Sequence, residues 1–242
     1  QKPPERDFKK TTISFKRVMR QIIAMHGWGG DSKMWSLWIK HFEKNGWTWQ
    51  SAERGYGNST LNQPNWITSN NGNYYEKRVL ICHSLGSHLI NSQILMESTD
   101  IVLLSSFGKF IPNCKSNRSL KIALQGMLQA LGTTKEKKML KSFLEKASSP
   151  HLINEMPSSP ISNELSLNGR KLLKDDLELL IKTKGLPYGI PSKSRVLTIF
   201  GEEDLILMPL TKNLLLQELK EHLESEPYHW TITQEGHSLL NK

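Results

Sequence analysis

The chain has 242 residues, of which 37% are hydrophobic, enough to form a sizeable core in one domain with or without an inserted subdomain. No run approaches the roughly 20 apolar residues that a transmembrane helix requires. The hydrophobic segment of a signal peptide is not found near the start. Two cysteines are too few for a disulfide framework, which favours a cytoplasmic protein with reduced thiols.

The formal net charge of +9 suggests an acidic partner, and nucleic acid is the first class to consider. The aromatic residues are not interleaved with Lys and Arg in a stacking pattern, and no zinc-finger or helix-turn-helix signature is found. The scattered histidines His41, His88, His151 and His222 form no ligand set. We therefore expect a monomer without a nucleic-acid partner, a membrane contact, a metal or a cofactor.

Short apolar runs predict six strands, the first of which is expected to be buried. The first 17 residues are polar and basic and predict a loose arm. The expected strands are 21–25, 47–52, 78–82, 101–104, 196–200 and 229–233. Helical spacing follows the first strand at 31–44 and the third at 87–96. Strands that alternate with helices predict an α/β fold with a mostly parallel central sheet flanked by helices.

Residues 111–190 differ from the rest of the chain because no strand-like run is found in them. Helices are expected over 120–131, 135–146 and 172–182, separated by Ser and Pro clusters. We therefore assign residues 1–110 and 191–242 to the core and residues 111–190 to a helical insertion between two strands. This insertion holds 13 Lys and Arg against 7 Asp and Glu, a surplus of six positive charges.

Three residues that carry chemistry follow expected strands. Ser84 follows the third strand within the stretch ICHSLGS, Asp204 follows the fifth, and His237 follows the sixth. Carboxyl ends of parallel strands meet at one edge of a sheet, so we expect these side chains to lie together. His237 would take the proton of a Ser84 nucleophile, and a buried Asp204 would orient and stabilise the imidazolium. Glu202 and Glu203 are alternative acids, although the G-x-x-D pattern favours Asp204.

The same reaction needs two donors for its tetrahedral intermediate. The backbone N–H of Leu85 is one candidate, and the N–H of Trp28, after the first strand, is the other. His83 is expected to be a buried, hydrogen-bonded histidine, and His26 is expected to fix the loop that carries Trp28. Tyr56 is expected either to shape the pocket or to lie in the core.

Four motifs resemble the α/β-hydrolase superfamily from about Arg20 to His237. They are HGWGG at 26–30 with Trp35 nine positions beyond His26, RGYGNS at 54–59, HSLG at 83–86 and GEED at 201–204. Within that superfamily they resemble the biotin-pathway pimeloyl-[acyl-carrier-protein] methyl ester esterases. Cys82 departs from the G-x-S-x-G pattern, but its small apolar side chain should be tolerated. The chain ends five residues after His237, so we expect His237 to be less shielded from water.

The resemblance implies that residues 111–190 form a lid over Ser84 and that its basic residues dock an acidic acyl carrier protein. The docking residues expected are Lys135, Lys138, Lys141 and Lys146. Trp28 and Phe143 are expected to contact substrate. Six apolar residues of this segment either line an acyl channel or, as expected for most of them, pack against the core: Leu124, Met127, Leu128, Leu131, Met139 and Phe143. The implied reaction cleaves the methyl ester of pimeloyl-[acyl-carrier protein] through an acyl-enzyme.

Three other functions stay open at this point. The first is a broad small-ester or thioester hydrolase that needs no carrier protein. The second is a ligand receptor that uses the pocket of this fold without turnover, and the third is a lyase on the same scaffold. Lys-to-Glu changes in the insertion would not affect the first of these, whereas they would slow a hydrolase that docks an acidic carrier.

Overall fold

The computed structural model describes residues 17–68, 74–115, 117–157, 159–163 and 165–239. Its strands form one sheet in the order β2-β1-β3-β4-β5-β6, and every neighbouring pair is parallel. The strands are β1 (Arg17–Met25), β2 (Thr48–Ala52), β3 (Tyr74–His83), β4 (Asp100–Leu104), β5 (Arg195–Gly201) and β6 (Tyr228–Ile232). The predicted α/β fold with a parallel central sheet is therefore confirmed.

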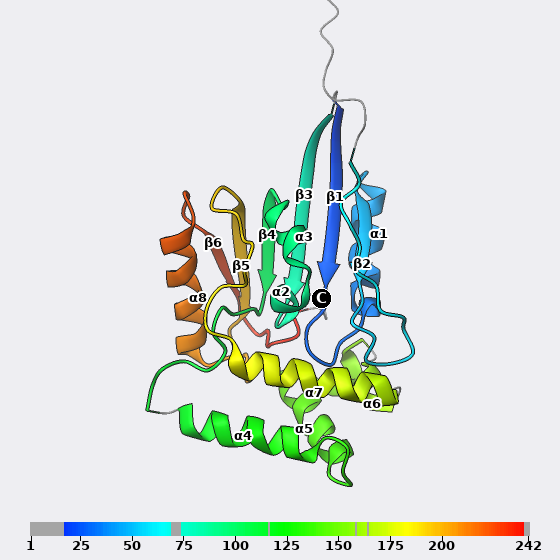
Figure 1. Ribbon diagram of the computed structural model, residues 1–242, viewed down its shortest axis with the longest axis vertical. Coiled ribbons are helices and arrows are strands. Elements are labelled where there is room, and N and C mark those ends of the chain that lie inside the picture. Colours follow the sequence, from blue (N-terminus) through cyan, green and yellow to red (C-terminus); the bar gives the residue numbers. More distant parts are fainter. Residues whose placement is uncertain (1–16, 69–73, 116, 158, 164, 240–242) are drawn as a thin grey trace, which may run out of the picture.

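Strands β1 and β3 are longer than predicted. They start at Arg17 and Tyr74 and pair over nine positions, so both extend past the other strands (Figure 1). Arg17, which we placed in the expected arm, is therefore part of β1, and residues 1–16 lie outside the described part of the chain. The added positions carry charged residues such as Arg20 and Lys77, which hide the strands from a search for apolar runs.

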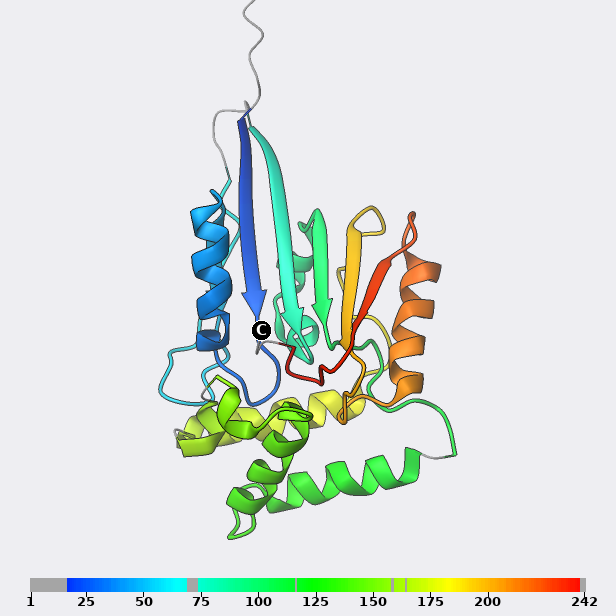
Figure 2. The ribbon, with the colours of Figure 1, turned by 180° about the vertical axis from the view of Figure 1, so that it is seen from behind.

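Helices pack on both faces of the sheet. On one face, η1 (Ser32–Trp35) and α1 (Ser36–Lys44) cover β1 and β3, with Trp38 and Phe42 packed against Ile22 and Ile81. On the other face lie α2 (Gly86–Leu89), α3 (Ser92–Met96) and α8 (Pro209–His222). Both α2 and α3 lie in front of the sheet in Figure 1 and behind it in Figure 2, which is seen from the opposite side.

The single helix predicted over 87–96 is wrong, because α2 and α3 are separate helices. Ile90 between them has extended backbone (ψ 148°), and the Asn91 side chain accepts a hydrogen bond from the Gln93 N–H to cap α3. The apolar residues Ile90, Ile94 and Leu95 keep helical spacing across this break. Periodicity alone therefore could not reveal it.

The segment between β4 and β5 contains α4 (Asn117–Ala130), α5 (Glu136–Ser148), η2 (Ile153–Glu155), α6 (Pro160–Asn163) and α7 (Leu167–Lys182). Three of these helices match predicted spans, whereas η2 and α6 were not predicted. Figure 1 shows α7 across the carboxyl ends of the strands, with α4 farther from the sheet. None of the helices in the described ranges has the length and apolar character needed to cross a membrane.

Helix α7 is fixed firmly to the loop after β2. Arg54 donates two hydrogen bonds of 2.7 Å to the carboxylate of Asp176, which also accepts one of 2.7 Å from the Tyr56 hydroxyl. A Cβ at Gly169 would lie 1.6 Å from the carbonyl oxygen of Tyr56, so only glycine permits this approach. We expected Tyr56 either to shape the pocket or to lie in the core. It is fully buried, and its hydroxyl helps to hold α7 against the loop after β2.

The outer edge of the sheet is exposed at β6. Tyr228 and Trp230 are 65% and 60% exposed, and Leu197 and Ile199 of the neighbouring β5 are only half-buried. In Figure 2 no helix lies over this part of the sheet face. The aromatic side chains of β6 are therefore exposed, whereas His237, which follows this strand, is buried.

Candidate active site

Ser84 lies on a strained turn between β3 and α2. Its φ of 51° is in the left-handed region, as expected for a serine that a sharp strand-to-helix turn presents at the edge of the sheet. Its N–H donates to the Leu104 carbonyl at 2.8 Å. A Cβ at Gly86 would lie 2.7 Å from the Met25 carbonyl oxygen, so glycine is required there. Cys82, in contrast, is fully buried in the main apolar core, which accommodates its side chain.

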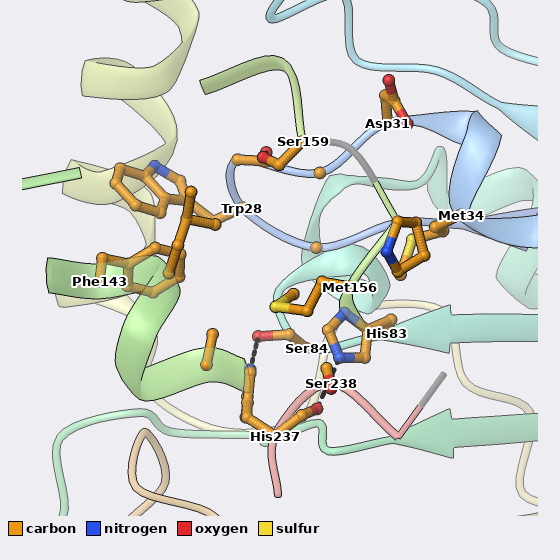
Figure 3. A pocket seen from close by; sticks show the side chains of 16 residues that line it. Trp28, Asp31, Met34, His83, Ser84, Phe143, Met156, Ser159, His237 and Ser238 are labelled. Carbon is orange, nitrogen blue, oxygen red and sulfur yellow. Dashed lines mark hydrogen bonds between the residues drawn. The ribbon is translucent and has the colours of Figure 1, made fainter. Parts of the chain in front are cut away.

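A continuous chain of hydrogen bonds joins Ser84, His237 and Asp204. The Ser84 Oγ lies 3.0 Å from His237 Nε2, and His237 Nδ1 lies 2.9 Å from Asp204 Oδ2. Figure 3 shows the first of these contacts. The other Asp204 oxygen accepts from the N–H groups of Ile206 and Leu207. A carboxylate partner places a proton on Nδ1, so Nε2 can accept the proton of Ser84.

The surroundings keep this carboxylate ionised. Burial acts to raise the pKa of Asp204, but the positive charge that His237 can carry and the hydrogen bonds to the carboxylate outweigh it and hold this pKa below its ordinary value. The Asp204 side chain is fully buried, whereas Glu202 and Glu203 are exposed. The structure therefore brings Asp204, and neither glutamate, against His237.

His237 is well shielded, contrary to the expectation from the short C-terminal segment. It is 3% exposed. A Cβ at Gly236 would lie 1.7 Å from the Ser149 carbonyl oxygen, so the end of α5 presses directly on the loop that carries His237. The segment between β4 and β5 thus shields His237 from water.

The loop after β1 is held from both sides. His26 Nδ1 donates to the Gly27 carbonyl at 2.9 Å, and the Arg54 N–H donates to His26 Nε2 at 3.1 Å. The Trp28 indole donates to the Leu173 carbonyl of α7 at 2.7 Å. Among the described residues, no hydrogen bond uses the backbone N–H of Trp28 or Leu85. Both groups are thus available as the two donors that were predicted.

His83 binds the backbone of the neighbouring histidine. Its Nε2 donates to the His237 carbonyl oxygen at 2.9 Å, and the two rings are 5.2 Å apart. Burial, with His237 nearby, lowers the pKa of His83 to about 3, so the ring is neutral at physiological pH. The structure thus places His83 as the buried, hydrogen-bonded histidine that the sequence suggested.

Ser84, Trp28 and Phe143 separate two cavities of different size. The small cavity, of about 70 Å³, is also lined by Gly27, His83 and His237. The large cavity, of about 580 Å³, lies between α4, α5 and α7. The rings of Trp28 and Phe143 meet edge to face at 4.9 Å. Both residues predicted to contact substrate therefore lie beside Ser84.

The large cavity is lined mostly by apolar residues of the segment between β4 and β5. Four of the predicted channel residues line it, namely Leu124, Met127, Met139 and Phe143. Leu128 and Leu131 do not line it and pack in the core instead. No described group of three or more His, Cys, Asp or Glu residues could hold a metal ion.

Three of the four predicted docking lysines line the large cavity. Lys135, Lys138 and Lys146 are exposed and project from or adjoin α5 at the cavity. Lys141 does not line it and lies 3.8 Å from Glu145 in an exposed ion pair. Lys141 lies one turn from Lys138 on the same helix, so the sequence could not predict that only Lys138 lines the cavity.

Sequence reasoning missed part of the wall of the small cavity. Met156 and Ser159, which precede and follow Pro157, line it together with Met34 and Ser238 (Figure 3). The Ser159 hydroxyl donates to the Gly29 carbonyl at 2.6 Å and so joins this segment to the loop after β1. The Ser and Pro pattern indicated only a break between helices, so nothing in the sequence pointed to this contact.

Comparisons with known proteins identify the fold. No protein-family model and no curated protein sequence matches the chain. In structure it is similar to the esterase EaEST from Exiguobacterium antarcticum, with a TM-score of 0.64, 13% identity, and coverage of 91% of this chain and 86% of that one. It is also similar to MGS-M2, an α/β hydrolase enzyme from a Medee basin deep-sea metagenome library, with a TM-score of 0.57, 15% identity, and coverage of 91% and 83%.

A third similar structure is the bottromycin epimerase BotH in complex with bottromycin A2, with a TM-score of 0.58, 11% identity, and coverage of 93% of this chain and 87% of that one. The chain therefore has the α/β-hydrolase fold. Identities this low establish the fold alone. Because an esterase and an epimerase share it, the reaction must be argued from the site.

Proposed function

We propose that this protein is a serine carboxylester hydrolase that acts through an acyl-enzyme. The observation that carries the proposal is the buried hydrogen-bonded chain from Ser84 through His237 to Asp204. Ser84 Oγ attacks the ester carbonyl while His237 Nε2 takes its proton. The N–H groups of Trp28 and Leu85 stabilise the oxyanion. His237 then protonates the leaving alcohol, and a water molecule hydrolyses the acyl-Ser84 by the same steps in reverse.

The two cavities support a small leaving alcohol and a longer acyl chain. His237 must reach the leaving oxygen in order to protonate it, and it lines the small cavity but not the large one. The alkoxy group is therefore assigned to the small cavity. A volume of about 70 Å³ is about half the 150 Å³ that holds benzene in an engineered cavity, so a methoxy or ethoxy group fits. The acyl chain is assigned to the large apolar cavity.

The specific substrate that we propose is the methyl ester of a pimeloyl chain carried on acyl carrier protein. The large cavity is apolar beside Ser84 and bears Lys135, Lys138 and Lys146 at its exposed side. Residues 111–190 carry six of the nine net positive charges of the chain. An acidic carrier would be attracted to this surface, which would speed its encounter and set its orientation.

The test compares hydrolysis of methyl and butyl esters of the same medium-length acid by the wild type and Ser84→Ala. We expect Ser84-dependent release of acid and at least about tenfold higher kcat/KM for the methyl ester, because a butoxy group exceeds the small cavity. Ser192→Ala is the matched control, because this half-buried serine precedes β5, at the end of the strand opposite Asp204, and its hydroxyl donates to Glu224. Absence of Ser84-dependent turnover in the wild type would reject the proposed serine hydrolase.

Hydrolysis of pimeloyl-acyl carrier protein methyl ester then tests the substrate. We expect kcat/KM for the carrier-linked ester to exceed that of free dimethyl pimelate and to fall with added salt. Equal values for both would favour the small-ester hydrolase that needs no carrier. Binding of the ester with no release of acid would favour the receptor.

A further inference from the structure

His83 has one ring nitrogen that the hydrogen bonds described so far leave unused. A carbonyl oxygen can only accept, so the contact with the His237 carbonyl requires a proton on His83 Nε2. The neutral ring then carries a lone pair on Nδ1. Among the described residues, no hydrogen bond ends on this nitrogen. The fold thus presents a fixed acceptor one residue before Ser84.

The space in front of this acceptor is kept open by a glycine. A Cβ at Gly27 would lie 3.1 Å from His83 Nδ1 and 2.9 Å from Ser84 Cβ. Any side chain there would fill the gap between the two residues. The gap belongs to the small cavity, whose volume of about 70 Å³ exceeds the roughly 10–15 Å³ that one water molecule needs. Figure 3 shows His83 beside Ser84 and His237.

We propose that His83 Nδ1 binds the water molecule that hydrolyses the acyl-enzyme. This inference rests on the proposed function. The water has two hydrogens. His237 Nε2 removes one as the oxygen attacks the acyl carbon, and His83 Nδ1 accepts a hydrogen bond from the other. The C–Oγ bond then breaks and His237 returns its proton to Ser84 Oγ. His83 takes up no proton itself, and its pKa of about 3 keeps Nδ1 an acceptor at neutral pH.

An alcohol provides the internal comparison. Methanol has one hydroxyl hydrogen, which His237 must remove, so it can attack the acyl-enzyme without an acceptor at His83. The ratio of acyl transfer to methanol over hydrolysis therefore reports the second hydrogen bond of water. Damage to Ser84, His237 or the oxyanion donors lowers both products and leaves this ratio unchanged.

Two substitutions separate the two nitrogens of His83. His83→Gln keeps an amide N–H near the position of Nε2 and removes the acceptor at Nδ1. His83→Asn keeps an amide oxygen near the position of Nδ1 and removes the donor to the His237 carbonyl. The experiment incubates each variant and the wild type with methyl hexanoate and trideuteromethanol, and mass spectrometry measures the deuterated ester and the free acid.

We expect His83→Gln to raise the ratio of deuterated ester to acid about threefold to tenfold, which corresponds to the loss of one neutral hydrogen bond. His83→Asn should keep the wild-type ratio and lower both rates. An unchanged ratio in His83→Gln, or an equal rise in both variants, would overturn the role of Nδ1. Absence of Ser84-dependent turnover in the wild type would instead reject the proposed function, and the two failures are thus distinguishable.

Discussion

The edge of the sheet at Ser84 and the outer helices α4 and α5 are built in opposite ways. At the edge, Ser84, His237 and the Asp204 side chain are each less than a tenth exposed and are held by hydrogen bonds. On α5 and beside it, Lys135 and Lys138 are exposed. A buried network tolerates little change, whereas solvated charges act at longer range and are screened by salt. Mutations in the buried network should therefore change the rate of the reaction much more than mutations of the exposed lysines change the recognition of substrate.

The largest effect should come from the buried end of the network. Asp204→Asn keeps the shape of the side chain but presents an amide N–H to His237, which favours the wrong tautomer. We expect kcat to fall roughly 10⁴-fold, measured on a methyl ester. Glu203→Gln, an exposed neighbour in the same loop, should keep wild-type activity. A similar loss in both variants would mean that the loop, rather than the Asp204–His237 contact, matters.

Helix α7 is held by buried hydrogen bonds like the edge of the sheet, although it lies in the same inserted segment as α4. Asp176→Ala would leave Arg54 and the Tyr56 hydroxyl without their partner, and a broken buried pair costs about 3–5 kcal/mol. We expect a loss near 3 kcal/mol in the free energy of unfolding by urea, since the Arg54 side chain is 23% exposed. Asp175→Ala, on the exposed side of the same helix, should change it by less than about 0.5 kcal/mol.

The neutral state of His83 predicts a pH dependence of stability. In the unfolded chain His83 takes up a proton near pH 6.5. In the folded protein, where its pKa is about 3, it does not. The unfolded state thus binds more protons between these values, so acid destabilises the fold. Between pH 7 and pH 5 the contribution is about 2 kcal/mol.

Urea unfolding at the two pH values checks this, with His83→Gln as the comparison. The wild type should lose about 2 kcal/mol more than the variant on acidification. An equal loss in both proteins would show that His83 is protonated in the fold or is not buried.

The smallest effect is expected on the outer helices. Lys135→Glu with Lys138→Glu should lower kcat/KM for a carrier-linked ester by about threefold to tenfold at low salt and leave a free methyl ester unaffected. Lys141→Glu is the matched control, because Lys141 does not line the large cavity. If Lys141→Glu acts as strongly as the pair, net charge alone guides the encounter.

The sequence predicted which residues meet at the edge of the sheet better than it predicted which lysines of α5 border the large cavity. Ser84, Asp204 and His237 each follow an apolar strand, and parallel strands bring their carboxyl ends together, so spacing was enough. Whether Lys138 or Lys141 borders the cavity depends on how α4 and α5 pack over α7, which the residue pattern does not encode. The break at Ile90 and the shielding of His237 by Ser149 likewise depend on packing between distant segments.

Labelling with an alkyl fluorophosphonate followed by peptide mass spectrometry tests directly whether Ser84 is the activated nucleophile. Only a serine activated by a neighbouring base displaces fluoride at a useful rate. We expect one phosphonyl group per chain, on the peptide that contains Ser84, with labelling abolished in Ser84→Ala and strongly slowed in Asp204→Asn. Labelling at another residue, or none in the folded wild type, would contradict the assignment of Ser84 as the nucleophile.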